Sequence, residues 1–170
     1  FEAFHELRLR KVLNELHIAG PVDDFAISLI ESIGIADSVK FHGYLNRYQL
    51  RQMYQSLEVF AITSYREGLG ISALEAMACG VPVVSTLCGG PEDFVKDGIT
   101  GYLSSASPIA FADRVCELLG ERGDYERISM ECRRTVSKNF SVRVFSDGLE
   151  RAWSSVWDES YCEDRFAGPG

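Results

Sequence analysis

Short apolar runs alternate with amphipathic segments along the chain. The runs are short, rich in branched residues and spaced by about 20 residues, a pattern typical of buried parallel strands. The predicted strands are 16–19, 39–42, 59–63, 82–85 and 101–103. Helical spacing of apolar residues follows the candidate caps Asp23 or Asp24, and Asn46. From about Pro108 the pattern is helical to Trp157, with breaks near 120–123 and 139–141.

This alternation of strands and helices predicts a Rossmann-like α/β fold with a doubly wound parallel sheet. In such sheets ligands bind beyond the carboxyl ends of the strands. Three glycine-bearing loops follow predicted strands and should lie at that edge: Gly43 to Leu45, Glu67 to Ile71, and Thr86 to Gly90. These loops are the first place to look for a ligand site.

Length and charge narrow the class of protein. The chain has 170 residues, enough for one domain with a real core, and a formal net charge of −8. An acidic chain without a basic patch is not expected to bind nucleic acid. The five cysteines show no C-x-x-C spacing, which favours reduced thiols over a disulfide frame or a zinc site. No metal-ligand motif or nucleophile–base set is visible.

The segment from Glu67 to Glu75 carries the candidate chemistry. Gly68 and Gly70 allow the backbone to approach a ligand, and the start of the following helix offers free N–H groups to an anion. Two glutamates on a helix are more often a solvated face, but the apolar residues around Glu75 indicate a mostly buried helix. A carboxylate there needs partners. A sugar nucleotide would use both the N–H groups and the carboxylates.

Two other segments allow two interpretations each. Gly89 and Gly90 precede a short helix and form either a second phosphate cradle or a flexible turn. Tyr44 either stacks on a base or is an ordinary aromatic at the rim. Trp153 and Trp157 have i, i+4 spacing and mark a helix face that packs on its own domain or on another one.

The run from Ser64 to Thr86 resembles the signature of retaining glycosyltransferases of family 4, which have the GT-B architecture. Gly89–Gly90, Asp97–Gly98 and Gly101 follow in the expected order, and the similarity extends over roughly residues 1–119. The chain is thus similar to the C-terminal, donor-binding half of such enzymes. The resemblance implies that residues 1–157 form the nucleotide-binding domain and residues 158–170 a tail.

The resemblance also implies roles for individual residues. Glu67 would contact the donor sugar as the catalytic residue, and Glu75 would accept the ribose hydroxyls. The remaining donor-binding positions would be Gly68, Leu69, Gly70, Ile71, Gly89, Gly90, Tyr44 and Leu45. The leaving diphosphate would take the proton of the acceptor, so neither a cofactor nor a metal is expected. Thr63, Leu69 and Asp93 depart from the common pattern, in ways that we expect to be tolerated.

Parts of such an enzyme are expected outside this sequence. The first strand of the domain, the basic pair that grips the diphosphate and the acceptor domain would all precede Phe1, so the isolated chain is expected to be inactive. The alternatives are a non-catalytic module that binds sugar nucleotides, and a subunit that works only with a separate chain carrying the acceptor domain. A cytoplasmic protein is expected, with a peripheral place at the inner face of the membrane left open through the missing part.

Overall fold

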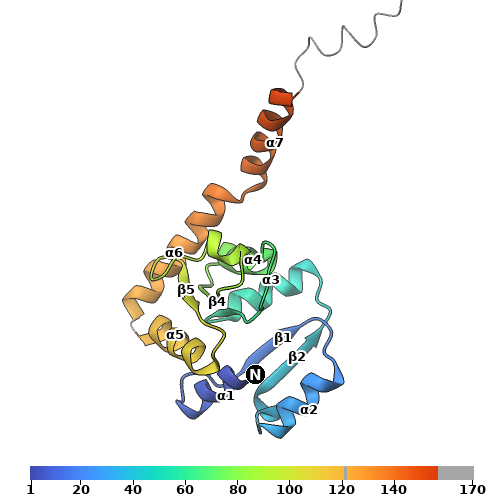
Figure 1. Cartoon of the computed structure of the whole chain (residues 1–170), viewed down its shortest axis with the longest axis vertical. Coiled ribbons are helices and arrows are strands. Elements are labelled where there is room, and N and C mark those ends of the chain that lie inside the picture. The colour runs from blue at the N-terminus through green and yellow to red at the C-terminus, as the bar shows by residue number, and fades with distance from the viewer. Residues whose placement is uncertain (121, 157–170) are drawn as a thin grey trace, which may run out of the picture.

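The computed structural model describes residues 1–120 and 122–156, and they form an α/β fold with parallel strands (Figure 1). The helices are α1 (Glu2–Leu9), α2 (Asp24–Ser32), α3 (Arg47–Ser56), α4 (Ile71–Ala78), α5 (Pro108–Gly120), α6 (Arg122–Asn139) and α7 (Val142–Val156). The strands are β1 (Leu16–Ala19), β2 (Val39–Gly43), β3 (Phe60–Ile62), β4 (Val83–Thr86) and β5 (Gly101–Ser104). Short 3-10 helices span Ala36–Ser38 and Gly90–Asp93. The predicted fold class is confirmed.

Local sequence signals account for the starts of α2 and α3. The side chain of Asp23 caps α2 by accepting a hydrogen bond from the backbone N–H of Ala26 at 2.8 Å. Asn46 and Gln49 form a reciprocal capping box at the start of α3. Both caps satisfy N–H groups that a helix start would otherwise leave without a partner. The predicted apolar face of α2 is less buried than expected, since Phe25 is 76% exposed.

The parallel strands form two separate sheets among the described residues. β1 pairs with β2, and β3, β4 and β5 form the other sheet in that order. Ile18 lies opposite Phe41 in the first sheet, and Val84 lies between Ala61 and Tyr102 in the second. β4 is the central strand of the larger sheet and is fully buried, as its apolar sequence predicts.

A cavity of about 900 Å³ lies between the two sheets. One side is lined by β1 through Leu16 and Ile18, and the other by β3 through Phe60 and Ala61. Within residues 1–120 and 122–156, each of these strands has a hydrogen-bonded neighbour on one side only. The cavity therefore separates two open strand edges.

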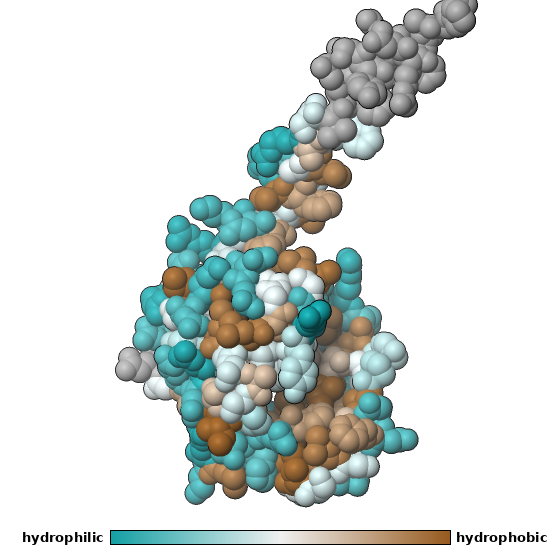
Figure 2. All heavy atoms as spheres, viewed as in Figure 1, coloured by the Kyte–Doolittle hydropathy of each residue, from teal (hydrophilic) through white to brown (hydrophobic). Residues whose placement is uncertain are grey.

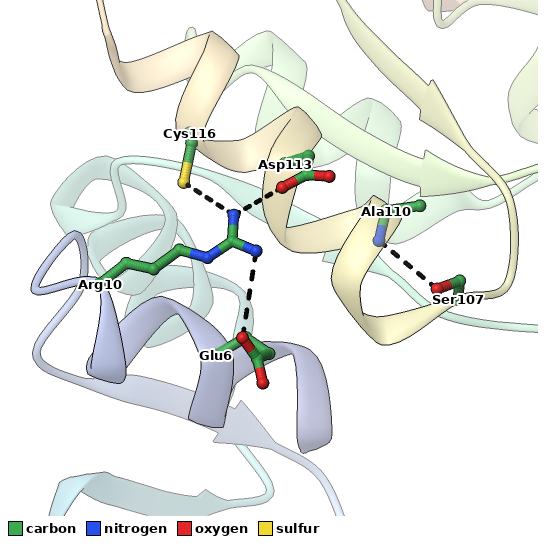
Figure 3. Close-up of polar contacts among 6 residues, drawn as sticks. All are labelled: Glu6, Arg10, Ser107, Ala110, Asp113 and Cys116. Carbon is green, nitrogen blue, oxygen red and sulfur yellow. Dashed lines mark hydrogen bonds and ion pairs between the residues drawn. The ribbon is translucent and has the colours of Figure 1, made fainter.

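Helix α1 joins the two hydrophobic clusters beside this cavity. Phe4 packs with Ile30 of α2, whereas Leu7, one turn later, belongs to the main core with Val84 of β4. Figure 3 shows how α1 is tied to α5. The guanidinium of Arg10 donates to Asp113 Oδ1 at 2.6 Å and to the Cys116 sulfur at 3.8 Å. α1 is thus held over both clusters by packing and by an ion pair.

Helix α6 packs on α4 and leads to α7, which projects away from the body of the molecule (Figure 1). Four apolar side chains of α7 are largely exposed: Val142, Phe145, Leu149 and Trp153. Figure 2 shows hydrophobic residues along this part of the molecule. Trp153 is 63% exposed, and Trp157 lies outside the described residues. The predicted contact of this tryptophan pair with another domain stays a prediction.

Candidate functional site

The start of α4 is an open helix N-terminus. Gly70 occupies the N-cap position with φ +75°, a left-handed conformation that glycine adopts without steric cost, and no side chain caps the helix. The carbonyl oxygen of Gly70 accepts from the N–H of Ala73 at 3.0 Å. Gly70 has no side chain that could accept from the N–H groups of Ile71 and Ser72. Ile71 at the first position is 65% exposed. Ile71 and Ser72 in the first turn are exposed, whereas Gly70 itself is buried. The first turn carries the positive end of the helix dipole.

Backbone hydrogen bonds join the loop after β3 to the loop after β4. The N–H of Glu67 donates to Cys88 O at 2.8 Å, and the N–H of Gly90 donates to Glu67 O at 3.0 Å. The two loops approach so closely that a Cβ on Gly90 would lie 1.9 Å from the carbonyl oxygen of Gly68. The structure thus brings the predicted residues of both loops together at the start of α4.

Side chains strengthen this junction. Thr86 Oγ1 donates to Ser64 O at 2.6 Å and so connects the end of β4 to the loop after β3. Glu92 Oε1 accepts from the N–H of Gly89 at 2.8 Å. These contacts fix the backbone of both loops before any ligand arrives.

The two glutamates occupy different positions beside the helix start. Glu67 is half-buried, and its Oε1 accepts from the N–H of Gly68 at 3.1 Å. Glu75 lies one turn along α4, is exposed to solvent, and accepts from the hydroxyl of Tyr54 at 3.2 Å through Oε2. Glu75 is therefore more exposed than its apolar neighbours in sequence suggest, yet it has the partner that a helix carboxylate needs.

Tyr54 was not among the residues singled out from the sequence. It lies on α3, its side chain is almost fully buried, and burial beside the Glu75 carboxylate raises the pKa of its phenol well above the ordinary value. In the sequence, Tyr54 shares helical spacing with the apolar residues Leu50 and Leu57. The available signal was that a buried tyrosine hydroxyl usually finds a hydrogen-bond partner.

Tyr44 and Leu45 lie on the loop between β2 and α3. The side chain of Tyr44 is 86% exposed. Within the described residues, no hydrogen bond or ring contact ties Tyr44 to the Glu67 loop. These two residues precede α3, and α3 lies against α4.

The predicted residues are exposed or half-buried, except Gly70, which is buried. The 900 Å³ cavity between the sheets is lined by none of them. Within residues 1–120 and 122–156, no group of three or more acidic, histidine or cysteine residues is arranged to hold a metal ion. In the same ranges, no helix is both long and apolar enough to cross a membrane. What the surface offers is N–H groups for an anion and two carboxylates for hydroxyl groups.

Comparisons with known proteins identify a family and several similar proteins. The family model described as "Glycosyl transferases group 1" matches residues 1–135. A D-inositol 3-phosphate glycosyltransferase of Corynebacterium diphtheriae is 33% identical over 144 residues, which are 83% of this chain and 34% of that protein. The Mycolicibacterium smegmatis protein of the same name is 38% identical over 133 residues, 77% of this chain and 31% of that one. The chain therefore spans about a third of the length of these relatives.

Solved structures show the same fold. Sucrose-phosphate synthase from Thermosynechococcus elongatus superposes with a TM-score of 0.82 at 22% identity, covering 91% of this chain and 41% of that one. Anabaena HepE, in a complex with UDP-glucose, gives a TM-score of 0.75 at 24% identity, with 83% and 41% covered.

Proposed function

The chain belongs to the group 1 glycosyl transferases, which have the GT-B architecture, and from that membership we propose that it is the donor-binding half of a retaining hexosyltransferase. It holds a nucleotide-diphosphate sugar, and the observation that carries the proposal is the uncapped start of α4. This start lies at the junction of two hydrogen-bonded glycine loops and is flanked by Glu67 and Glu75.

Each part of the donor has a matching group on this surface. The N–H groups of Leu69, Gly70 and Ile71 bind the diphosphate and the sugar, because a helix start favours negative charge. Glu75 accepts hydrogen bonds from the ribose, and Glu67 accepts from hydroxyls of the donor sugar. A carboxylate that bonds a hydroxyl gains more than a neutral acceptor does, because its charge strengthens the bond.

Gly89 and Gly90 complete the donor site, since their loop supports the backbone of Glu67. The loop with Tyr44 and Leu45 meets the base.

The proposed reaction transfers the sugar with retention of its anomeric configuration. The bond between the anomeric carbon and the diphosphate oxygen breaks, and a bond from the same carbon to the acceptor oxygen forms on the same face. The proton of the acceptor passes to the departing diphosphate, so no protein base is required. The contribution of this half is to position the donor and to stabilise the developing negative charge with N–H groups fixed in advance.

The acceptor half lies outside the described chain in this proposal, so the isolated chain binds donor without turning it over. The HepE complex with UDP-glucose makes a uridine nucleotide the first donor to test. The names of the curated relatives make D-inositol 3-phosphate the first acceptor to test in protein that carries both halves.

The direct test is a thermal-shift panel with UDP, GDP, ADP and their common sugar conjugates. A ligand at ten times its Kd stabilises the fold by about 1.4 kcal/mol, which raises Tm by a few degrees. A shift with one base supports the donor site and identifies the nucleotide. No shift with any nucleotide contradicts donor binding by this chain.

Substitutions of the two glutamates then separate their roles. Glu75→Ala should weaken nucleotide binding by about 1–3 kcal/mol through lost hydrogen bonds to the ribose. Glu67→Ala should leave the bare nucleotide nearly unaffected and weaken only the nucleotide sugar. Equal losses for both ligands in the Glu67 variant would contradict this division.

A further inference from the structure

The carboxylate of Glu75 accepts a hydrogen bond from a buried phenol. Tyr54 is 4% exposed, and its hydroxyl donates to Glu75 Oε2 at 3.2 Å. Its ring packs with Ala76 and Val81 in a small cluster and meets Phe60 edge to face at 5.8 Å. Packing restrains the ring, and the hydroxyl points toward the Glu75 carboxylate.

This contact makes the two carboxylate oxygens of Glu75 different. Oε2 accepts from Tyr54, whereas Oε1 takes part in no hydrogen bond within the described residues. An exposed glutamate without such a partner samples many rotamers, and ordering it when a ligand binds costs conformational entropy. A glutamate already held in one rotamer binds more tightly because that cost falls before binding.

We propose that Tyr54 is a positioning residue that holds Glu75 in the rotamer that accepts the ribose hydroxyls. Tyr54 thereby sets the preference of the site for ribonucleotides over nucleotides that lack those hydroxyls. The proposal rests on the donor-binding function above, because it acts through the ribose contact of Glu75. Tyr54 itself touches no ligand.

The chain offers a matched control for the loss of one phenol hydroxyl. Tyr125 on α6 is partly buried and donates to the backbone carbonyl of Glu58 at 2.9 Å. Its pKa is raised mainly by burial, like that of Tyr54, but its hydrogen bond does not involve Glu75. Tyr125→Phe therefore removes a comparable structural hydrogen bond without touching the proposed site.

The experiment measures Kd by calorimetry for the nucleoside diphosphate selected by the panel and for its 2′,3′-dideoxy analogue. In Tyr54→Phe, the ribonucleotide should bind about three- to tenfold more weakly, whereas the dideoxy analogue should bind as it does to the parent. Tyr125→Phe should change neither affinity. In a Glu75→Ala background, adding Tyr54→Phe should have no further effect on nucleotide affinity.

Different failures have different meanings. If Glu75→Ala weakens binding and Tyr54→Phe does not, the positioning role is wrong and the donor site stands. Equal weakening of both nucleotides in Tyr54→Phe would show a general structural effect and would also overturn the positioning role. If Glu75→Ala leaves ribonucleotide affinity unchanged, the ribose contact is absent, and both proposals fail.

Discussion

The close approach of the two glycine loops makes Gly90 the most sensitive position of the candidate site. Gly90 does not have a left-handed φ, so an alanine there could adopt the same backbone conformation. The cost of the substitution is instead a steric clash of the added Cβ. Its Cβ would lie 1.9 Å from Gly68 O, 2.6 Å from Gly68 C and 2.8 Å from Leu69 Cα. All three atoms belong to the backbone and cannot rotate away. The loops must therefore separate by about 1–2 Å to reach normal contact distances.

This separation would break the contacts that join the loops. The bonds from Glu67 N–H to Cys88 O and from Gly90 N–H to Glu67 O measure 2.8 and 3.0 Å, and either would exceed hydrogen-bond length after such a shift. Losing both costs about 1–3 kcal/mol, and the remaining overpacking adds to this. We expect Gly90→Ala to lower the free energy of unfolding by about 3 kcal/mol and Tm by about 6–12 °C.

Gly68→Ala is the matched control for this substitution. Gly68 lies in the opposing loop, also without a left-handed φ, and a Cβ there would meet no atom within 4 Å. Denaturant unfolding of the three proteins gives the comparison, and nucleotide titration reports the site. Gly68→Ala should unfold like the parent, whereas Gly90→Ala should be less stable and bind nucleotide more weakly. A Gly90→Ala protein as stable as Gly68→Ala would refute the close packing of these loops.

Two further predictions concern the core. Thr100 is 1% exposed, donates to Phe94 O at 2.7 Å and accepts from Lys96 N–H at 2.9 Å, so Thr100→Val should cost about 2–4 kcal/mol in urea unfolding. A cost below about 0.5 kcal/mol would contradict this role. Burial raises the pKa of Cys132 from 9.0 to about 12. Above pH 9 the unfolded chain therefore loses this proton while the native protein keeps it, and stability should fall by up to about 1.4 kcal/mol per pH unit. Cys132→Ala should show a shallower fall between pH 9 and 11, and an unchanged slope would exclude this thiol as a cause.

Much of the fold could be predicted because its signals are local. The cap residues Asp23 and Asn46 start helices where the sequence placed them, and the apolar run of β4 is the buried central strand. The order of strands and loops also predicted that the Glu67 and Gly89–Gly90 loops share one edge. The backbone hydrogen bonds between them confirm that they are neighbours.

The rest depends on contacts between residues far apart in sequence. The hydrogen bond from Tyr54 to Glu75 joins two helices, and no spacing along the chain predicts it. The need for glycine at position 90 is likewise visible only in three dimensions, because a Cβ there would collide with the backbone of Gly68. Phe25 has the position of a core residue in the helical pattern but is exposed, because only part of the apolar face of α2 meets the small sheet.

The division of the core into two clusters, which α1 bridges, has a consequence for cooperativity. β1, β2 and α2 form one small unit around Ile30, and the larger sheet with α4 forms another, so each can open locally with its own free energy. The Tyr44 loop leaves the small unit, whereas α4 belongs to the large one. In amide hydrogen exchange, the two units should open separately in the free protein. A nucleotide held by both would couple their opening. Protection in β1 and β2 would then rise with ligand concentration, although neither strand touches the phosphates.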